Sequence, residues 1–206
     1  MHLLGTGLSA TDNHEDALSV REAHLSLVRR LGASEEDVLA AQGNLAITYQ
    51  HLGRLEEALS MRRDTYSGTL NIEGEESRNT QLEALNYANV LLRLKRFEEA
   101  KALLRKMMPV ARRLLGESHE LTLRMRLIYA KALYQDDSGT LDDLREAVST
   151  HEEAEQTARR VLGGAHPLTG AIEESLQETR AVLRACECDD VGAVRAALDA
   201  MTVRKK

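Results

Sequence analysis

The chain has 206 residues, of which 43% are hydrophobic and 29% charged, and its formal net charge is −6. Nonspecific nucleic-acid binding needs basic side chains that displace counterions from phosphates, so we expect no nucleic-acid partner for this acidic chain. No run approaches the 18 or so apolar residues of a membrane-spanning helix, so we expect no membrane partner either.

Helix-forming residues dominate the composition, with two prolines and no Trp, so the sequence predicts helix nearly throughout. Cys186 and Cys188 are the two cysteines, and they are too close together for an unstrained disulfide. So few cysteines are typical of a reducing compartment, and the opening MHLLGTGLSA lacks the basic start of a signal peptide. We therefore expect a cytoplasmic protein.

An internal period organises the chain. Glycines mark it: Gly32, Gly74 and Gly116 are 42 residues apart, and Gly163 follows after 47. An alanine stands sixteen residues before three of them, at Ala58, Ala100 and Ala147. The five extra residues of the last interval fall in QDDSGTLDD after Tyr134, and we expect them in a loop, where a longer chain is tolerated best.

Each repeat reads as helix A, a tight turn and helix B. Apolar residues such as Val38, Ala41 and Leu45 recur every three or four positions, as on one face of a helix. The glycines are expected to end helices B, and Ser34 with Asp37 resembles a capping box. Inside a helix B, Pro109 is expected to kink or split it.

In chain order, the elements form one predicted domain over residues 1–206. It comprises a half repeat at about 14–32, full repeats at about 34–74, 75–116 and 117–163, a half repeat at about 164–187, and a capping helix at about 190–203. A capping helix is needed because stacked repeats expose apolar surface at their ends. The weak cap before residue 14 indicates that residues 1–13 fold over the first helix, or that the chain is a fragment of a longer array.

These repeats resemble the tetratricopeptide repeat. The matching residues are Leu31–Gly32, Asn44–Ala46, Tyr49, Leu52–Arg54 and Glu56–Leu59, in the pattern LGxxH…NLAxxYxxLGRxEEAL. The 42-residue period and the LGxxH link are similar to those of kinesin light chains. Lys95 in place of the turn glycine and Ile128 in place of the helix-A asparagine depart from the pattern. The resemblance implies an all-α fold, an α-solenoid of antiparallel helix pairs in a right-handed superhelix, whose A helices line a concave peptide-binding surface.

The resemblance implies that a ligand contacts side chains beside the packed face of each helix A. Four such positions per helix, separated by 4, 3 and 4 residues, lie on one side of the helix. Of the twelve positions, none is acidic and three are Lys or Arg, which favours an acidic ligand in a locally positive groove. The candidate binding residues are Asn44, Asn86, Asn89, Arg93, Arg124 and Lys131. The resemblance implies that Asn44 and Asn86 grip a peptide backbone. In chaperone-binding members of the family, a set of Lys, Asn and Arg side chains clamps the terminal carboxylate of the peptide. A complete clamp of this kind is not expected here, since Ala40 and Ile128 replace two of its basic residues.

Enzyme and metal motifs are lacking, so no catalytic residue, cofactor or metal is expected. His119 and His166, each three residues after a repeat glycine, are interpreted as structural residues at helix starts. His151, followed by two glutamates, is interpreted as solvent-exposed. We therefore predict a non-catalytic scaffold or adaptor that binds a protein or peptide, preferably acidic. The alternative is a structural or regulatory fragment of a larger repeat protein that packs in cis without its own peptide ligand. The sequence leaves the oligomeric state open and favours a monomer.

Overall fold

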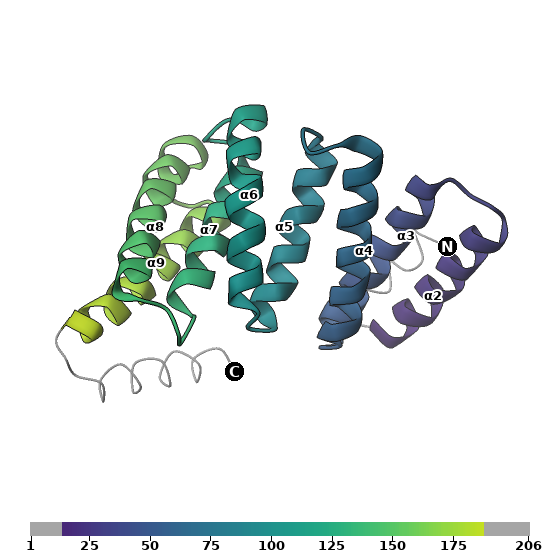
Figure 1. Ribbon diagram of the computed structural model, residues 1–206, viewed down its shortest axis with the longest axis horizontal. Coiled ribbons are helices and arrows are strands. Elements are labelled where there is room, and N and C mark those ends of the chain that lie inside the picture. The colour runs from purple at the N-terminus through teal and green to yellow at the C-terminus, as the bar shows by residue number, and fades with distance from the viewer. Residues whose placement is uncertain (1–13, 188–206) are drawn as a thin grey trace. The chain divides into compact units, whose positions relative to one another are not determined.

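The computed structural model describes residues 14–187, which form helices joined by short turns and contain no strand (Figure 1). The helices are α2 (His14–Arg30), α3 (Glu35–His51), α4 (Leu55–Glu73), α5 (Arg78–Arg93), α6 (Phe97–Leu115), α7 (Glu120–Tyr134), α8 (Leu141–Leu162) and α9 (Pro167–Glu187). The all-α prediction is therefore confirmed. The predicted capping helix at 190–203 and the segment 1–13 lie outside the described residues.

The chain divides into two compact units, Met1–Leu94 and Lys95–Lys206, called unit 1 and unit 2 below. Helices α3, α5, α7 and α9 hold the positions predicted for A helices, and α2, α4, α6 and α8 those predicted for B helices. In unit 1, each helix from α2 to α5 packs against the next one along the chain. Short turns between packed neighbours make them antiparallel.

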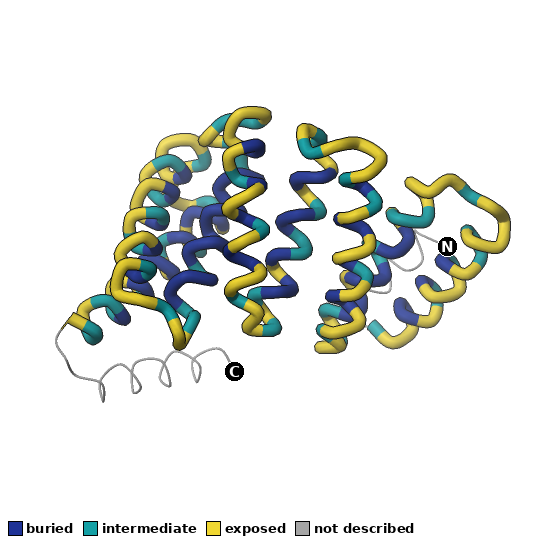
Figure 2. The backbone as a smooth tube through the Cα atoms, viewed as in Figure 1, coloured by how far each residue is buried: buried dark blue, intermediate teal, exposed yellow. Residues whose placement is uncertain are grey.

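Unit 2 continues this pattern from α6 to α9, and α7 also contacts α9. Its core includes a buried cluster of Leu123 and Leu127 on α7, Ala154 and Ala158 on α8, and Leu168 and Ile172 on α9. Most of the described helices have one buried and one exposed face (Figure 2), but α7 is buried nearly all round, with Arg124 its one exposed residue. Fully buried alanines, including Ala46, Ala88 and Ala130 at matching repeat positions, allow close approach of the helices.

The repeat glycines end the helices as predicted. Gly32, Gly74, Gly116 and Gly163 have φ between 65° and 92°, a conformation that glycine adopts without a Cβ clash. Lys95, which replaces the turn glycine of the neighbouring repeat, adopts φ 59°. Backbone geometry is thus retained at this turn even where the glycine is not.

The starts of the A helices differ between the units. In unit 1, the hydroxyls of Ser34 and Ser77 accept hydrogen bonds from the backbone N–H groups of Asp37 and Asn79, both at 3.1 Å. In unit 2, Nδ1 of His119 accepts from the N–H of Leu121 at 3.1 Å, and Nδ1 of His166 accepts from that of Leu168 at 3.2 Å. The structural interpretation of both histidines is therefore confirmed.

Helix α6 runs from Phe97 to Leu115 through Pro109, so of the two expected effects of this proline, a kink or a split, the split does not occur. Pro109 lies on the exposed side of the helix. A carbonyl left without its intrahelical partner there can bond to water, which reduces the penalty of the missing N–H.

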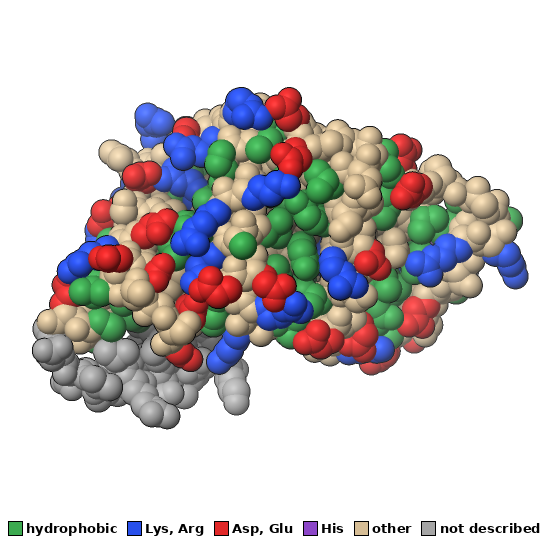
Figure 3. Space-filling view, in the orientation of Figure 1, with side chains coloured by type: hydrophobic (Ala, Val, Ile, Leu, Met, Phe, Trp, Pro, Cys, Tyr) green, Lys and Arg blue, Asp and Glu red, His purple; other side chains and the backbone are tan. Residues whose placement is uncertain are grey.

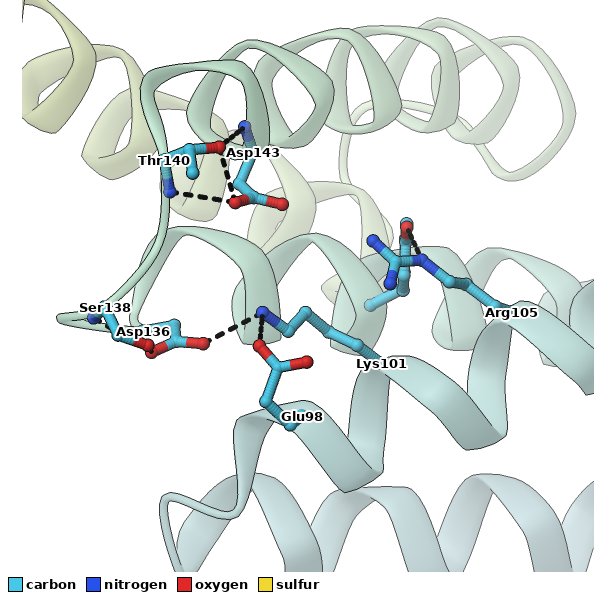
Figure 4. Close-up of polar contacts among 8 residues, drawn as sticks. Glu98, Lys101, Arg105, Asp136, Ser138, Thr140 and Asp143 are labelled. Atoms are coloured by element: carbon cyan, nitrogen blue, oxygen red, sulfur yellow. Dashed lines mark hydrogen bonds and ion pairs between the residues drawn. The ribbon is translucent and has the colours of Figure 1, made fainter.

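The extra residues are divided between the loop that joins α7 to α8 and the first turn of α8, which begins before Leu144, the match of Leu55 and Phe97. The prediction of a loop is therefore confirmed in part, and this loop is anchored to α6 (Figure 4). Nζ of Lys101, whose residue is 3% exposed, lies 2.8 Å from Oδ2 of Asp136 and 2.5 Å from Oε1 of Glu98. Burial of Asp136 acts to raise its pKa, but hydrogen bonds from Lys101 and Ser138 outweigh it and hold the pKa at about 2. The loop is thus held by a buried ion pair.

The same loop starts α8 with a capping box. The hydroxyl of Thr140 accepts from the N–H of Asp143 at 3.1 Å, and the carboxylate of Asp143 accepts from the N–H of Thr140 at 2.8 Å (Figure 4). This reciprocal pair satisfies two backbone donors at the helix start. Hydrogen bonds from the backbone N–H and the hydroxyl of Thr140 also lower the pKa of Asp143, because both favour the carboxylate.

Candidate functional site

The predicted binding residues of unit 1 lie on α3 and α5, which both pack against α4. Asn44 and Asn86 are half-buried in the middle of their helices, whereas Asn89 and Arg93 are exposed. We define the A-helix face of unit 1 as Ala40, Asn44, Ile47 and His51 of α3 with Leu82, Asn86, Asn89 and Arg93 of α5. Each of these residues lies on the A helix to which the repeat period assigns it.

A buried arginine of α2 holds the backbone of α3 at Asn44. Nη1 of Arg21 donates to the backbone carbonyl of Asn44 at 2.7 Å and to Oγ1 of Thr48 at 2.5 Å. Arg21 is buried, and its burial lowers its pKa. These hydrogen bonds fix one turn of α3 against α2 at the position of the candidate binding residue.

Asn86 has an acidic neighbour that the predicted set did not contain. Its Nδ2 donates to Oε1 of Glu83 at 3.3 Å, and Oε2 of Glu83 accepts from Nη1 of the buried Arg62 at 3.1 Å. Glu83 therefore connects a binding candidate on α5 to the core side of α4. The spacing of three residues between Glu83 and Asn86 was a usable signal in the sequence.

Aliphatic side chains accompany the asparagines. Ile47 is 37% and Leu82 38% exposed. At the far end of the face, Nη2 of Arg93 donates to the carbonyl of Gln50 at 3.2 Å, and the ring of His51 stacks on that of His14 with centroids 4.6 Å apart. The face thus combines amides and aliphatic groups, with its cation at one end.

In unit 2, the predicted residues Arg124 and Lys131 lie on α7. Arg124 is exposed and donates through Nη2 to Oε1 of Glu120, one turn earlier, at 2.6 Å. This hydrogen bond lowers the pKa of Glu120. Lys131 is half-buried. The sequence analysis counted Arg124 among the cations that could attract an acidic ligand. The carboxylate of Glu120 offsets this positive charge.

A polar network beside Lys131 joins α7 to α9. The hydroxyl of Tyr134 donates to Oε2 of Glu178 at 2.6 Å and accepts from Nε2 of Gln135 at 3.1 Å. Burial, and then the hydrogen bond to Glu178, raise the pKa of Tyr134. The polar groups at this end of unit 2 are therefore engaged with one another.

The interpretation of His151 as solvent-exposed is wrong. Its residue is 0% exposed, and its Nδ1 lies 3.2 Å from Oγ1 of Thr179 on α9. Burial, together with the positive charge of Lys131, lowers the pKa of His151 to about 4. His151 stands twelve residues before Gly163, as Arg62 and Leu104 stand before their glycines, and both of those are buried. The period could therefore have revealed its burial.

Within residues 14–187, no cluster of three or more His, Cys, Asp or Glu side chains could hold a metal ion. Cys186 is half-buried, whereas Cys188 lies outside the described residues. A hollow of about 280 Å³ beside the α7–α8 loop is lined by both charge signs, including Lys95, Arg96, Glu98, Glu99 and Asp136. Acidic and basic side chains are also mixed over the surface drawn in Figure 3. None of the described helices is long and apolar enough to cross a membrane.

Solved structures with the same fold include kinesin light chain-like repeat proteins. BtubC (BKLC) from P. vanneervenii is 18% identical with a TM-score of 0.72, covering 99% of this chain and 78% of that one. A putative kinesin light chain of Podosopora anserina with nearly identical TPR-like repeats is 20% identical with a TM-score of 0.73, covering 97% and 94%. A substituted form of those repeats is 17% identical with a TM-score of 0.74, covering 98% and 91%.

Sequence comparison gives the family. No curated protein matches the chain. The sequence profile of the tetratricopeptide repeat family matches residues 1–68 and 80–138, more than half of the chain. With the glycine-terminated helix pairs described above, this match shows that the chain belongs to the tetratricopeptide repeat family.

Proposed function

We propose that this protein is a non-catalytic adaptor that binds an extended peptide segment of a partner on its A-helix faces. Tetratricopeptide repeats generally mediate protein–protein interaction, and the proposal adds a ligand type and a site. The supporting observation is the pair Asn44 and Asn86, which recur at one repeat position and are half-buried in mid-helix. An amide offers both a donor and acceptors to an extended main chain.

A preference for acidic ligands would depend on Arg93, Arg124 and Lys131. Long-range attraction favours association with an oppositely charged segment. However, the carboxylate of Glu120 lies against Arg124, so the field that a ligand meets is smaller than the sequence alone indicates. The proposed function therefore does not include acidic selectivity, and the composition of the peptides that bind tests it separately.

The test is a selection of peptides from a random dodecapeptide library displayed on phage, with the whole chain as bait. Recovered peptides are then measured against wild type and the Asn44→Ala/Asn86→Ala variant by fluorescence anisotropy. We expect the double variant to bind roughly tenfold or more weakly, as for central interface residues. Asn71→Ala, an exposed asparagine on the B helix α4, is the matched control and should bind as wild type does.

Equal binding by wild type and Asn44→Ala/Asn86→Ala would contradict the proposal. Failure to recover any peptide would favour the alternative, a structural or regulatory array that packs in cis within a larger protein. Light scattering of the bait checks the further proposal that the chain is a monomer, and localisation of a tagged chain checks the cytoplasmic assignment.

A further inference from the structure

Ile47 and Leu82 stand apart from the other large hydrophobic side chains that are exposed in the described residues. Those others lie at or near helix ends, where one helix joins the next: Leu31, Ile72, Leu114, Leu141 and Val161. Ile47 and Leu82 instead lie within α3 and α5, on the same face as Asn44 and Asn86. An aliphatic group on an outward-facing helix surface gains free energy only when a partner covers it.

Two charged groups near these aliphatics, Glu83 and Arg93, are engaged within unit 1. Glu83 accepts from Arg62 and from Asn86, and Arg93 donates to the carbonyl of Gln50 at the end of α3. The exposed cations of α5, Arg78 and Arg93, lie at its two ends, so an acidic ligand side chain placed against Ile47 or Leu82 would lose hydration in contact with aliphatic groups. The face is thus complementary to an uncharged ligand.

The spacing of the two aliphatics limits the ligand further. Leu82 corresponds to Ala40 in the repeat, so Ile47 lies two helical turns further along its helix than Leu82 does, roughly 10 Å. The two side chains also lie on different helices, and helix axes are at least about 8–10 Å apart, so the distance to be covered is roughly 14 Å, or about four residues of an extended chain. Side chains on one side of an extended chain recur at every second residue, so a spacing of four residues places both on the same side.

We propose that the A-helix face of unit 1 selects an uncharged, extended segment with aliphatic side chains about four residues apart. Those side chains contact Ile47 and Leu82, while the main chain between them bonds to Asn44 and Asn86. This inference depends on the proposed function, and it assigns the ligand chemistry to unit 1.

The peptides recovered from the dodecapeptide library test this inference through their composition. We expect them to be rich in Leu, Ile and Val at positions i and i+4 and poor in Asp and Glu. Affinity should change less than about twofold between low and physiological salt, because screening acts on charge pairs and not on apolar contacts. Acidic recovered peptides whose affinity falls steeply with salt would overturn the inference.

Substitution locates the contacts. Ile47→Glu and Leu82→Glu should each weaken binding of the recovered peptides roughly tenfold, while Leu114→Glu, at a similarly exposed aliphatic of unit 2, should not. Ile47→Thr and Leu82→Thr, with circular dichroism of every variant, separate lost contacts from lost folding. If Asn44→Ala/Asn86→Ala weakens binding and the Ile47 and Leu82 variants do not, this inference fails and the proposed function stands. If none of them weakens binding, both fail.

Discussion

The A helices of the two units carry different chemistry at the same repeat positions. Where α3 and α5 have Asn44 and Asn86, α7 and α9 have Ile128 and the buried Ser175. Where α3 has Ile47, α9 has Glu178, which accepts a hydrogen bond from Tyr134 of α7. In unit 2, Glu178 thus joins two A helices, whereas in unit 1 Ile47 stays exposed at the matching position and Asn86 contacts Glu83 of its own helix. We propose that equivalent positions of the repeat serve stability in unit 2 and recognition in unit 1.

The largest expected change in unfolding free energy comes from the substitution of Lys101 in unit 2. Lys101→Ala leaves Asp136 without its buried partner, and we expect unfolding free energy to fall by about 3–5 kcal/mol. Arg96→Ala, which breaks the exposed pair with Glu99, is the matched control and should change it by less than about 1 kcal/mol. Urea denaturation gives both values. Similar losses in the two variants would show that the anchored loop contributes nothing special to unit 2.

His151 should make unit 2 sensitive to acid. Its folded-state pKa of about 4 lies below the ordinary value of 6.5, so the folded chain binds fewer protons than the unfolded chain between these pH values. Unfolding free energy should therefore fall as pH drops through this window, by about 3 kcal/mol in all. His151→Leu, which introduces the residue type that Leu104 provides at the matching position, should lack this component. Urea denaturation at each pH gives the unfolding free energy of both proteins. Equal pH dependence of this free energy in wild type and His151→Leu would refute the prediction.

Tyr134→Phe tests whether the polar network of unit 2 is structural. Loss of the hydroxyl between Glu178 and Gln135 should reduce unfolding free energy by about 1–2 kcal/mol. It should leave peptide binding unchanged, because we assign recognition to unit 1. Tyr49→Phe removes a 3.1 Å hydrogen bond to Glu22 in unit 1 and provides a comparison. Weaker peptide binding by Tyr134→Phe would indicate that the network also serves the ligand.

The smallest effect is expected from Arg124→Glu. Its pair with Glu120 is exposed on both sides, and such helix pairs contribute about 0.3–0.5 kcal/mol. Binding of the recovered peptides should change less than about threefold. A much larger loss, relieved by high salt, would restore the acidic-ligand hypothesis and transfer recognition to unit 2.

The local features of the fold could be predicted because they depend on short-range rules. Gly116 and Gly163 end helices, and His119 and His166 start the next ones, as their places in the period indicate. The pairing of Glu120 with Arg124 follows from a spacing of four residues and was available to sequence reasoning.

Other features depend on contacts between segments that no spacing rule connects. Lys101 occupies a position where the neighbouring repeats have Leu59 and Val148, and it is tolerated there because the inserted loop supplies Asp136. Glu178 meets Tyr134 across 44 residues of sequence. Such pairs can be identified only from the packed structure. A polar side chain that takes part in one, such as Glu178, is already hydrogen-bonded within the protein.

The hydrogen bond from Arg21 to the carbonyl of Asn44 connects the proposed binding face to the first described helix. A ligand that orders Asn44 should also strengthen this bond, and linkage requires that docking of α2 strengthen ligand binding by the same factor. Amide hydrogens of α2 should therefore exchange more slowly in the presence of peptide, although α2 contributes no residue to the A-helix face. Through Arg21, a helix outside the site becomes a reporter of its occupancy.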